Sequence, residues 1–128
     1  MPFLDEYGKA RQNAARKYSA AFEGHKNIIA PSICDICDCH VFHQYTLRII
    51  DGDRNGLMEH LLAKGIPCAI YYPIPLHSQK AYADARYKEE DFPVTNQLVK
   101  EVISLPMHTE LDDEQIKFIT DSVLEFFN

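Results

Sequence analysis

The residues of this chain best suited to bind a ligand gather around two closely spaced prolines. The prolines at positions 73 and 75 stiffen the backbone, because proline has no amide donor and restricts both its own φ and the residue before it. The polar and aromatic side chains on this stretch belong to Tyr71, Tyr72, His77, Ser78, Gln79 and Tyr82. An imidazole can donate to or accept from a hydroxyl or a phosphate oxygen, and a tyrosine offers a ring to stack and a hydroxyl to bond. We expect His77 first and Tyr72 next to contact a ligand. Tyr71 is a further candidate, and Gln79 and Tyr82 are weaker ones.

The same stretch also fits an ordinary connection between a strand and a helix. His77 would then be an exposed loop histidine, and Tyr72 would be a core aromatic that closes the end of a sheet. Neighbouring residues of a strand point to opposite faces, so at most one of Tyr71 and Tyr72 is expected in the core. The residue types alone leave both interpretations open.

A second cluster that could do chemistry is the segment SICDICDCH, in which Cys34, Cys37 and Cys39 are followed by His40 and, three residues on, by His43. Thiolates and imidazoles are ligands that zinc takes. However, the second pair of ligands that usually follows at a distance is missing, and the C-x-C spacing would crowd three ligands onto a few residues. We therefore expect thiols in a loop and no metal site.

Period-two alternation of apolar side chains predicts the strands that position these residues. The expected strands are 27–30, 41–50, 66–72 and 103–105. The third of them ends near Tyr72, where the prolines begin. In the second, His43 shares a face with Tyr45 and is expected as a core histidine. Arg48 lies on the other face and is expected to pair with a carboxylate or to remain in solvent.

Apolar stripes at helical spacing predict four helices. They are expected over 3–23, from Asp53 to Gly65, from Pro93 to Val102 and from Asp112 to Phe126. Asp53 suits an N-cap and Gly65 suits a helix end, and Asp112 with Gln115 matches a capping box. The residues of the second helix expected to face inward are Leu57, Leu61 and Leu62. Strands and helices together predict one α+β domain, with helices on one side of a small sheet.

The composition excludes several classes of protein. The chain has 128 residues, is 46% hydrophobic and 25% charged, and carries a formal charge of −6. This is ordinary globular composition, long enough for one domain with its own core. The absence of a Lys/Arg-rich run argues against nucleic-acid binding, and no apolar run is long enough to predict membrane insertion. Four cysteines without a regular framework favour a reducing, cytoplasmic location.

Five segments of the chain resemble, in order, motifs of the DegT/DnrJ/EryC1/StrS family. These segments are FLDEYGKARQNAARKYSAAF, HVFHQYTLRI, RNGLMEHLLAKGI, YYPIPLHSQKAY and DFPVTNQLVKEVISLPMHTELDDEQI. The resemblance as a whole extends over nearly all of residues 3–127. Members of this family are aminotransferases that depend on pyridoxal phosphate (PLP) and mostly act on nucleotide-linked keto-sugars.

The resemblance implies a particular part of such an enzyme. The fold would be the C-terminal small domain of a fold-type I aminotransferase, with a small, mainly antiparallel sheet, helices packed on one side and a long helix in front. Residues 1–25 would be a linking helix, residues 26–128 the small α+β domain, and the catalytic large domain would be absent.

The chemistry of PLP indicates that this chain could contact a substrate but could not carry out transamination alone. Transamination needs a Schiff-base lysine, an acidic partner for the pyridinium nitrogen and a phosphate cup. The resemblance assigns these to the large domain, and none of the eight lysines lies in an apolar run that would desolvate it. We expect the chain alone to be inactive, with no catalytic residue and no bound PLP. In the full-length enzyme it would help domain closure and contact a nucleotide-sugar substrate through His77, Tyr72, Tyr71 and Gln79, in polysaccharide or amino-sugar biosynthesis.

The resemblance also implies a homodimer of the full-length enzyme. If a large domain once covered the first helix, apolar side chains should be exposed there, with Tyr7, Tyr18 and Phe22 as candidates. Two alternatives remain. One is a self-standing, non-catalytic binding or interaction module that kept the fold. The other is a small metal-binding protein that uses the cysteine segment.

Overall fold

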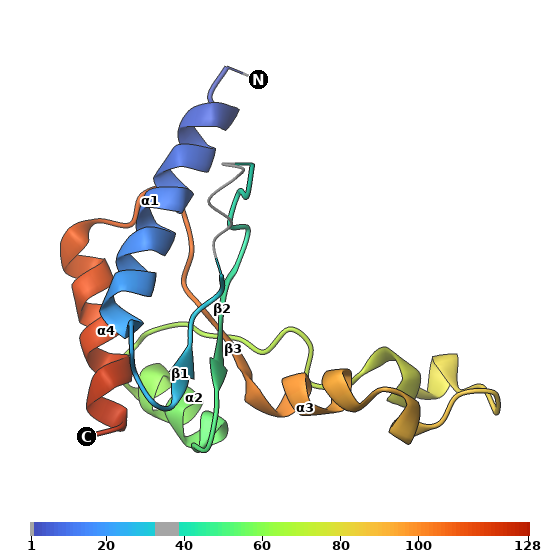
Figure 1. Ribbon diagram of the computed structural model, residues 1–128. Helices are drawn as coiled ribbons and strands as arrows, with labels where there is room; N and C mark the ends of the chain where they lie inside the picture. The colour runs from blue at the N-terminus through green and yellow to red at the C-terminus, as the bar shows by residue number, and fades with distance from the viewer. Residues whose placement is uncertain (1, 33–38) are drawn as a thin grey trace.

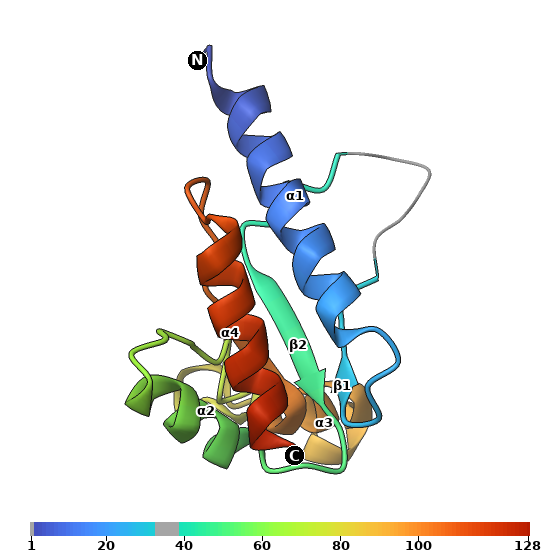
Figure 2. The same cartoon turned by 90° about the vertical axis from the view of Figure 1, so that its left-hand side faces the viewer.

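The computed structural model describes residues 2–32 and 39–128. Its elements are α1 (Leu4–Phe22), β1 (Ile28–Ile29), β2 (Tyr45–Ile49), α2 (Arg54–Ala63), α3 (Pro93–Glu101), β3 (Val102–Leu105) and α4 (Asp113–Phe126). The strands form one antiparallel sheet in the order β1-β2-β3. In Figures 1 and 2, α1 and α4 lie side by side over one face of this sheet, with α2 next to α4. The expected α+β fold, with helices packed on one side of a small antiparallel sheet, is confirmed.

The central strand β2 shows the predicted alternation most clearly. Tyr45, Leu47 and Ile49 are buried beneath the helices, whereas Thr46 and Arg48 are half-buried on the other face. The pairing register sets Tyr45 opposite Leu105 and Ile49 opposite Ile28. A slip of one residue would turn this apolar set away from the core, so burial of one face specifies the register.

Side-chain caps begin two of the helices where the sequence predicts them. The carboxylate of Asp53 accepts from the amide of Gly56 at 2.9 Å. Asp112 and Gln115 form a reciprocal capping box, in which the backbone amide of Gln115 donates to Asp112 Oδ1 at 2.8 Å. Each cap satisfies an amide at the helix start that has no partner within the helix. Gly65 follows α2 with a φ of +75°, which glycine adopts without a side-chain clash.

The core contains two tyrosines whose hydroxyls are both hydrogen-bonded. The hydroxyl of Tyr18 donates to the carbonyl of Pro106 at 3.0 Å, and the hydroxyls of Tyr45 and Ser19 are 2.9 Å apart. The two tyrosine rings contact each other with centroids 4.9 Å apart. Burial raises the pKa of Tyr45 to about 12 and also raises the pKa of Tyr18. These bonds fasten α1 to the sheet and to the segment that follows β3.

The predicted strand over 66–72 is wrong in its extent. A single bridge forms there, in which Ala69 and Ser104 exchange amide-to-carbonyl bonds of 3.1 and 2.7 Å. Pro67 has no amide to donate and Pro73 restricts the residue before it, so pairing is confined to the residues between them. The strand expected over 41–50 also begins late, at Tyr45, because Phe42 takes a positive φ of 43°.

Four side chains lie in environments that differ from the expected ones. Tyr18 and Phe22 are buried and not exposed on α1, because the sheet and α4 cover this end of the helix. Leu62 is 48% exposed, unlike Leu57 and Leu61. His43 is exposed and not a core histidine, because it precedes the paired part of β2. Tyr7 is exposed as expected, together with Phe3 and Leu4 at the protruding start of α1 (Figure 2).

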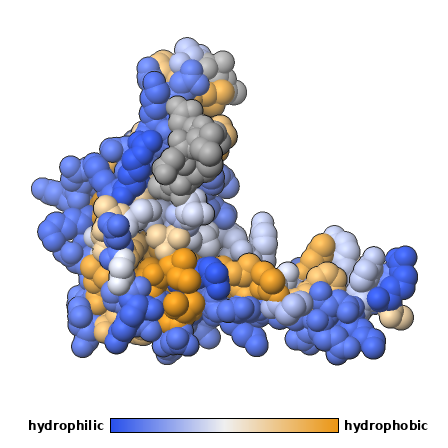
Figure 3. Space-filling model, viewed as in Figure 1, coloured by the Kyte–Doolittle hydropathy of each residue, from blue (hydrophilic) through white to orange (hydrophobic). Residues whose placement is uncertain are grey.

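Residues 71–101 form an arm that extends away from the core (Figure 1). Along the chain, the last element of the arm is α3, which continues into β3 without an intervening loop. Hydrophobic side chains gather over its base (Figure 3).

Within the described residues, no helix combines the length and apolar character needed to cross a membrane.

Neighbouring leucines of α2 provide a test of the packing. Leu61→Ala, which empties a site of 0% exposure, should lower the free energy of unfolding by about 2–5 kcal/mol. Leu62→Ala, on the adjacent exposed position, should change it by less than about 0.5 kcal/mol. Urea denaturation followed by circular dichroism measures both. Equal losses in the two variants would contradict the packing described for this helix.

Candidate functional site

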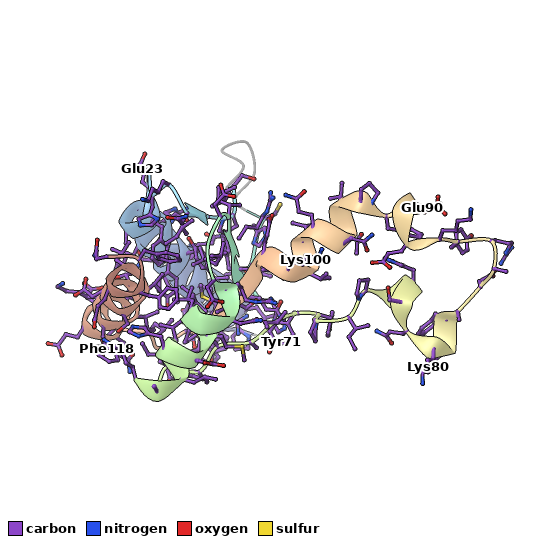
Figure 4. All side chains as sticks on the ribbon, turned by 90° about the horizontal axis from the view of Figure 1, so that it is seen from below. Glu23, Tyr71, Lys80, Glu90, Lys100 and Phe118 are labelled. Atoms are coloured by element: carbon purple, nitrogen blue, oxygen red, sulfur yellow. The ribbon has the colours of Figure 1, made fainter. Side chains whose placement is uncertain are left out.

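The arm consists of an outgoing segment and the returning helix α3, seen from below in Figure 4. The outgoing segment contains three short 3-10 turns, at Leu76–Ser78, Lys80–Tyr82 and Glu89–Asp91. Pro73 and Pro75 exclude a continuing strand, and Pro93 occupies the first turn of α3, where a missing amide costs nothing. No residue of the arm between 71 and 101 is fully buried. The arm therefore depends on specific contacts between its two limbs.

His77, the first of the predicted site residues, makes the main contact of this kind. Its ring stacks on Phe92, with centroids 4.3 Å apart and an interplanar angle of 15°. Its Nε2 lies 3.0 Å from Oδ1 of Asn96. Asn96 also donates from Nδ2 to the carbonyl of Glu89 at 2.6 Å. His77 is thus half-buried and anchored, whereas the sequence suggested a side chain held out from the loop.

Three of the other predicted residues lie around one hollow on the adjacent flank of α3, and Tyr82 is not among them. Tyr71, Tyr72 and Gln79 line this hollow, which has a volume of about 580 Å³. The remaining lining residues are Ile74, Pro75, Leu76, Thr95, Leu98, Val99 and Val102. Tyr72 is 72% exposed and Tyr71 46%, so neither is a core residue. The structure brings three candidates together, and His77 is not among the residues lining this hollow.

Phe92 and Asn96 were missed by reasoning from the sequence. They lie four residues apart across the start of α3, and residues at this spacing lie on the same side of a helix. An aromatic and an amide so placed, following a proline-rich loop with a histidine, are the signal that could have indicated a contact between loop and helix. The separation of 19 positions between His77 and Asn96 conceals this contact in the sequence.

Charged side chains attach the arm to the sheet. Arg48 pairs with Glu101, with Nη2 and Oε2 2.8 Å apart, as expected for a carboxylate partner. A hydrogen bond from Gln97, together with the bond and charge of Arg48, lowers the pKa of Glu101. Arg54 at the start of α2 donates to the carbonyls of Val102 and Val99 at 2.9 and 3.3 Å. The junction between α3 and β3 is therefore bonded to both neighbouring elements.

A second hollow, of about 400 Å³, lies beside the base of the arm. Its lining includes His43, Cys68, Tyr71, Ser104 and His108. Burial raises the pKa of the Cys68 thiol, and a raised pKa keeps the sulfur in its weakly nucleophilic form. Tyr71 borders both hollows.

A metal ion and a covalently held PLP each place their own requirements on the described residues. No group of three or more His, Cys, Asp or Glu side chains there is arranged to hold a metal. Cys34 and Cys37 lie outside the described residues, so the expected absence of a metal at the cysteine segment stays a prediction. All eight lysines are described, and none is buried or lines either of these hollows. A Schiff-base lysine needs a desolvated amine, so PLP does not fit these residues as a covalent cofactor.

The fold and the arm define a small α+β unit whose exposed aromatic side chains border a hollow. Residues 1–124 match the DegT/DnrJ/EryC1/StrS aminotransferase family. The chain therefore belongs to this family.

Individual relatives agree with this assignment. A UDP-2-acetamido-2-deoxy-3-oxo-D-glucuronate aminotransferase of Pseudomonas aeruginosa is 38% identical over 93% of this chain and 31% of its own length. A "pleiotropic regulatory protein" of Geobacillus stearothermophilus is 36% identical over 98% of this chain and 34% of its own. The crystal structure of DesV from S. venezuelae, in complex with a ketimine intermediate, is 30% identical, with a TM-score of 0.87 over 98% of this chain and 33% of that one. The chain thus spans about a third of the length of the relatives it matches.

The contact between His77 and Phe92 should determine how rigid the arm is. Phe92→Ala should speed trypsin cleavage after Lys80 and Arg86 by about tenfold, because losing an aromatic stack raises the population of the opened loop. The control Val94→Ala removes a side chain that is 68% exposed on the same helix, and should leave the rate unchanged. Mass spectrometry of timed digests measures both, and equal rates for Phe92→Ala and the unmodified chain would contradict the role of this stack.

Proposed function

We propose that this chain is the C-terminal small domain of a PLP-dependent aminotransferase that acts on nucleotide-linked keto-sugars. Residues 1–25 link it to a large catalytic domain, and residues 26–128 form the small domain. Its task is to contact the substrate and to help close the active site. The full-length enzyme is a cytoplasmic homodimer in this proposal.

The observation that carries the proposal is the group of Tyr71, Tyr72 and Gln79 around the hollow of the arm. An exposed tyrosine ring offers a face on which a base or a sugar ring can stack. The amide of Gln79 can both donate to and accept from hydroxyl groups. The names of the relatives support this ligand class, since one of them is an aminotransferase of a UDP-linked keto-sugar.

The chemistry is divided between this domain and the rest of the enzyme. PLP, when bound, supplies the electron sink for moving an amino group. The residues of this chain bind and orient the substrate. The arm presents the tyrosines at a fixed distance from the core, and the stiff loop reduces the entropy lost on binding. A closing domain also excludes water from the reaction.

A self-standing binding module remains as a second candidate because the chain has a complete core of its own. Buried side chains from α1, α2, α4 and all three strands form one cluster. Such a module would bind a ligand at the arm without any partner domain. Both candidates predict no covalent PLP on the chain alone, so the kinetic experiment on Tyr72 below is the one that separates them.

The chain alone should not bind PLP covalently. Mixed with PLP and treated with borohydride, it should show no stable internal-aldimine band and no mass increase on a specific lysine. The physical reason is that none of its lysines is buried, whereas a Schiff-base lysine needs a desolvated amine. A reducible band assigned to one lysine would refute the proposal that the Schiff-base lysine lies outside this chain.

Tyr72 should contribute to substrate binding in the complete protein that carries this chain. Tyr72→Ala should raise the KM for the nucleotide-linked substrate about tenfold, because one base–aromatic stack is worth about 1–3 kcal/mol, and Tyr72→Phe should retain most of the affinity. Tyr82→Ala is the control, since Tyr82 is 59% exposed on the same arm and does not line the hollow. Steady-state kinetics that show the same KM for Tyr72→Ala and Tyr82→Ala would exclude the hollow as the binding site.

A further inference from the structure

Asn96 connects three segments of the arm through a single side-chain amide. It lies on α3, donates from Nδ2 to the carbonyl of Glu89 at 2.6 Å, and faces Nε2 of His77 with Oδ1 at 3.0 Å. The bond to Glu89 belongs to the last 3-10 turn before α3, and the bond to His77 belongs to the first turn of the loop. The same amide therefore ties both ends of the outgoing segment to the returning helix.

The chemistry of these partners determines which ring nitrogen of His77 carries a proton. A backbone carbonyl can only accept, so the nitrogen of the Asn96 amide must face Glu89. The amide oxygen must then face His77, and an oxygen of this kind can only accept. Nε2 of His77 is therefore the donor and bears a hydrogen. This holds for the neutral ring and for the charged ring alike.

The plane of the imidazole is set by the same helix. Phe92 precedes Asn96 by four residues, and its ring stacks on His77 at 4.3 Å. One contact fixes the face of the imidazole and the other fixes the direction of Nε2. Among the described residues, no further hydrogen bond to the His77 ring is found, so Nδ1 is the nitrogen left for a ligand.

We propose that Asn96 is a positioning residue that holds His77 in the Nε2-protonated form, so that Nδ1 is offered to a sugar hydroxyl of the substrate. This deepens the proposed function and rests on it for the nature of the ligand. In the neutral ring, Nδ1 has a lone pair and no hydrogen, so it accepts a hydrogen bond from a hydroxyl. A phosphate oxygen offers no hydrogen to such a nitrogen, and this is why the proposal names the sugar.

The protonation of the ring can be measured without any ligand. In long-range ¹H–¹⁵N spectra of the chain at pH 8, His77 should show the Nε2–H pattern. Asn96→Ala should turn this pattern into a mixture of the two tautomers. Asn96→Asp should restore it, because a carboxylate oxygen still accepts from Nε2. Gln97→Ala, which removes an amide from the neighbouring position of α3, should leave the pattern unchanged.

Two results of this measurement would overturn the role of Asn96. One is an Nδ1–H pattern in the unmodified chain. The other is an unchanged Nε2–H pattern in Asn96→Ala. Neither result depends on substrate binding, so each would leave the proposed role of Tyr72 standing.

The ligand is tested by adding UDP-N-acetylglucosamine or UDP to the same sample. The sugar nucleotide should move the Nδ1 resonance of His77, and UDP alone should not. An equal shift with UDP would assign the contact to the phosphates and overturn the hydroxyl. If neither compound moves the resonance while the tautomer is as stated, the ligand contact of His77 fails, whereas the proposed function still rests on Tyr71, Tyr72 and Gln79.

Discussion

The arm depends on one contact, in which His77 lies against Phe92 and Asn96. An extended segment outside the core cannot be stabilised by buried apolar area, since it has little to bury. Stacking and a hydrogen bond between its limbs take that role here. Because the amide of Asn96 also binds the carbonyl of Glu89, the whole outgoing segment is held to α3 at two points.

This contact fixes the position of the arm only if α3 is itself held against the sheet. The helix passes directly into β3, whose residues pair with β2 in the middle of the sheet. Arg48 and Arg54 bind the junction from β2 and from α2. The hollow of Tyr71 and Tyr72 is therefore fixed relative to the sheet. A binding group placed in this way loses less entropy when a ligand arrives than one on a loose loop.

The core and the arm of this unit are built from different parts of the chain. The side chains that pack the core come from the helices and the sheet, and those of the arm remain at the surface. The hollow bordered by Tyr71 and Tyr72 is therefore separate from the core. The two relatives compared are about three times as long as this chain, so under the proposed function the groups that make and break bonds belong to the remaining length.

Local patterns of the sequence determined the helices, the caps of α2 and α4, the central strand and the stiffness of the loop after Tyr72. These features depend on residues a few positions apart, whose physical preferences act within each segment. The extent of the strand before Pro73 was misjudged because Pro67 limits pairing to one bridge. Only the tertiary structure decided that His77 meets Asn96, and that Tyr71 and Gln79 border a hollow against α3. Contacts between segments distant along the chain follow from how the elements pack, and no local periodicity contains that information.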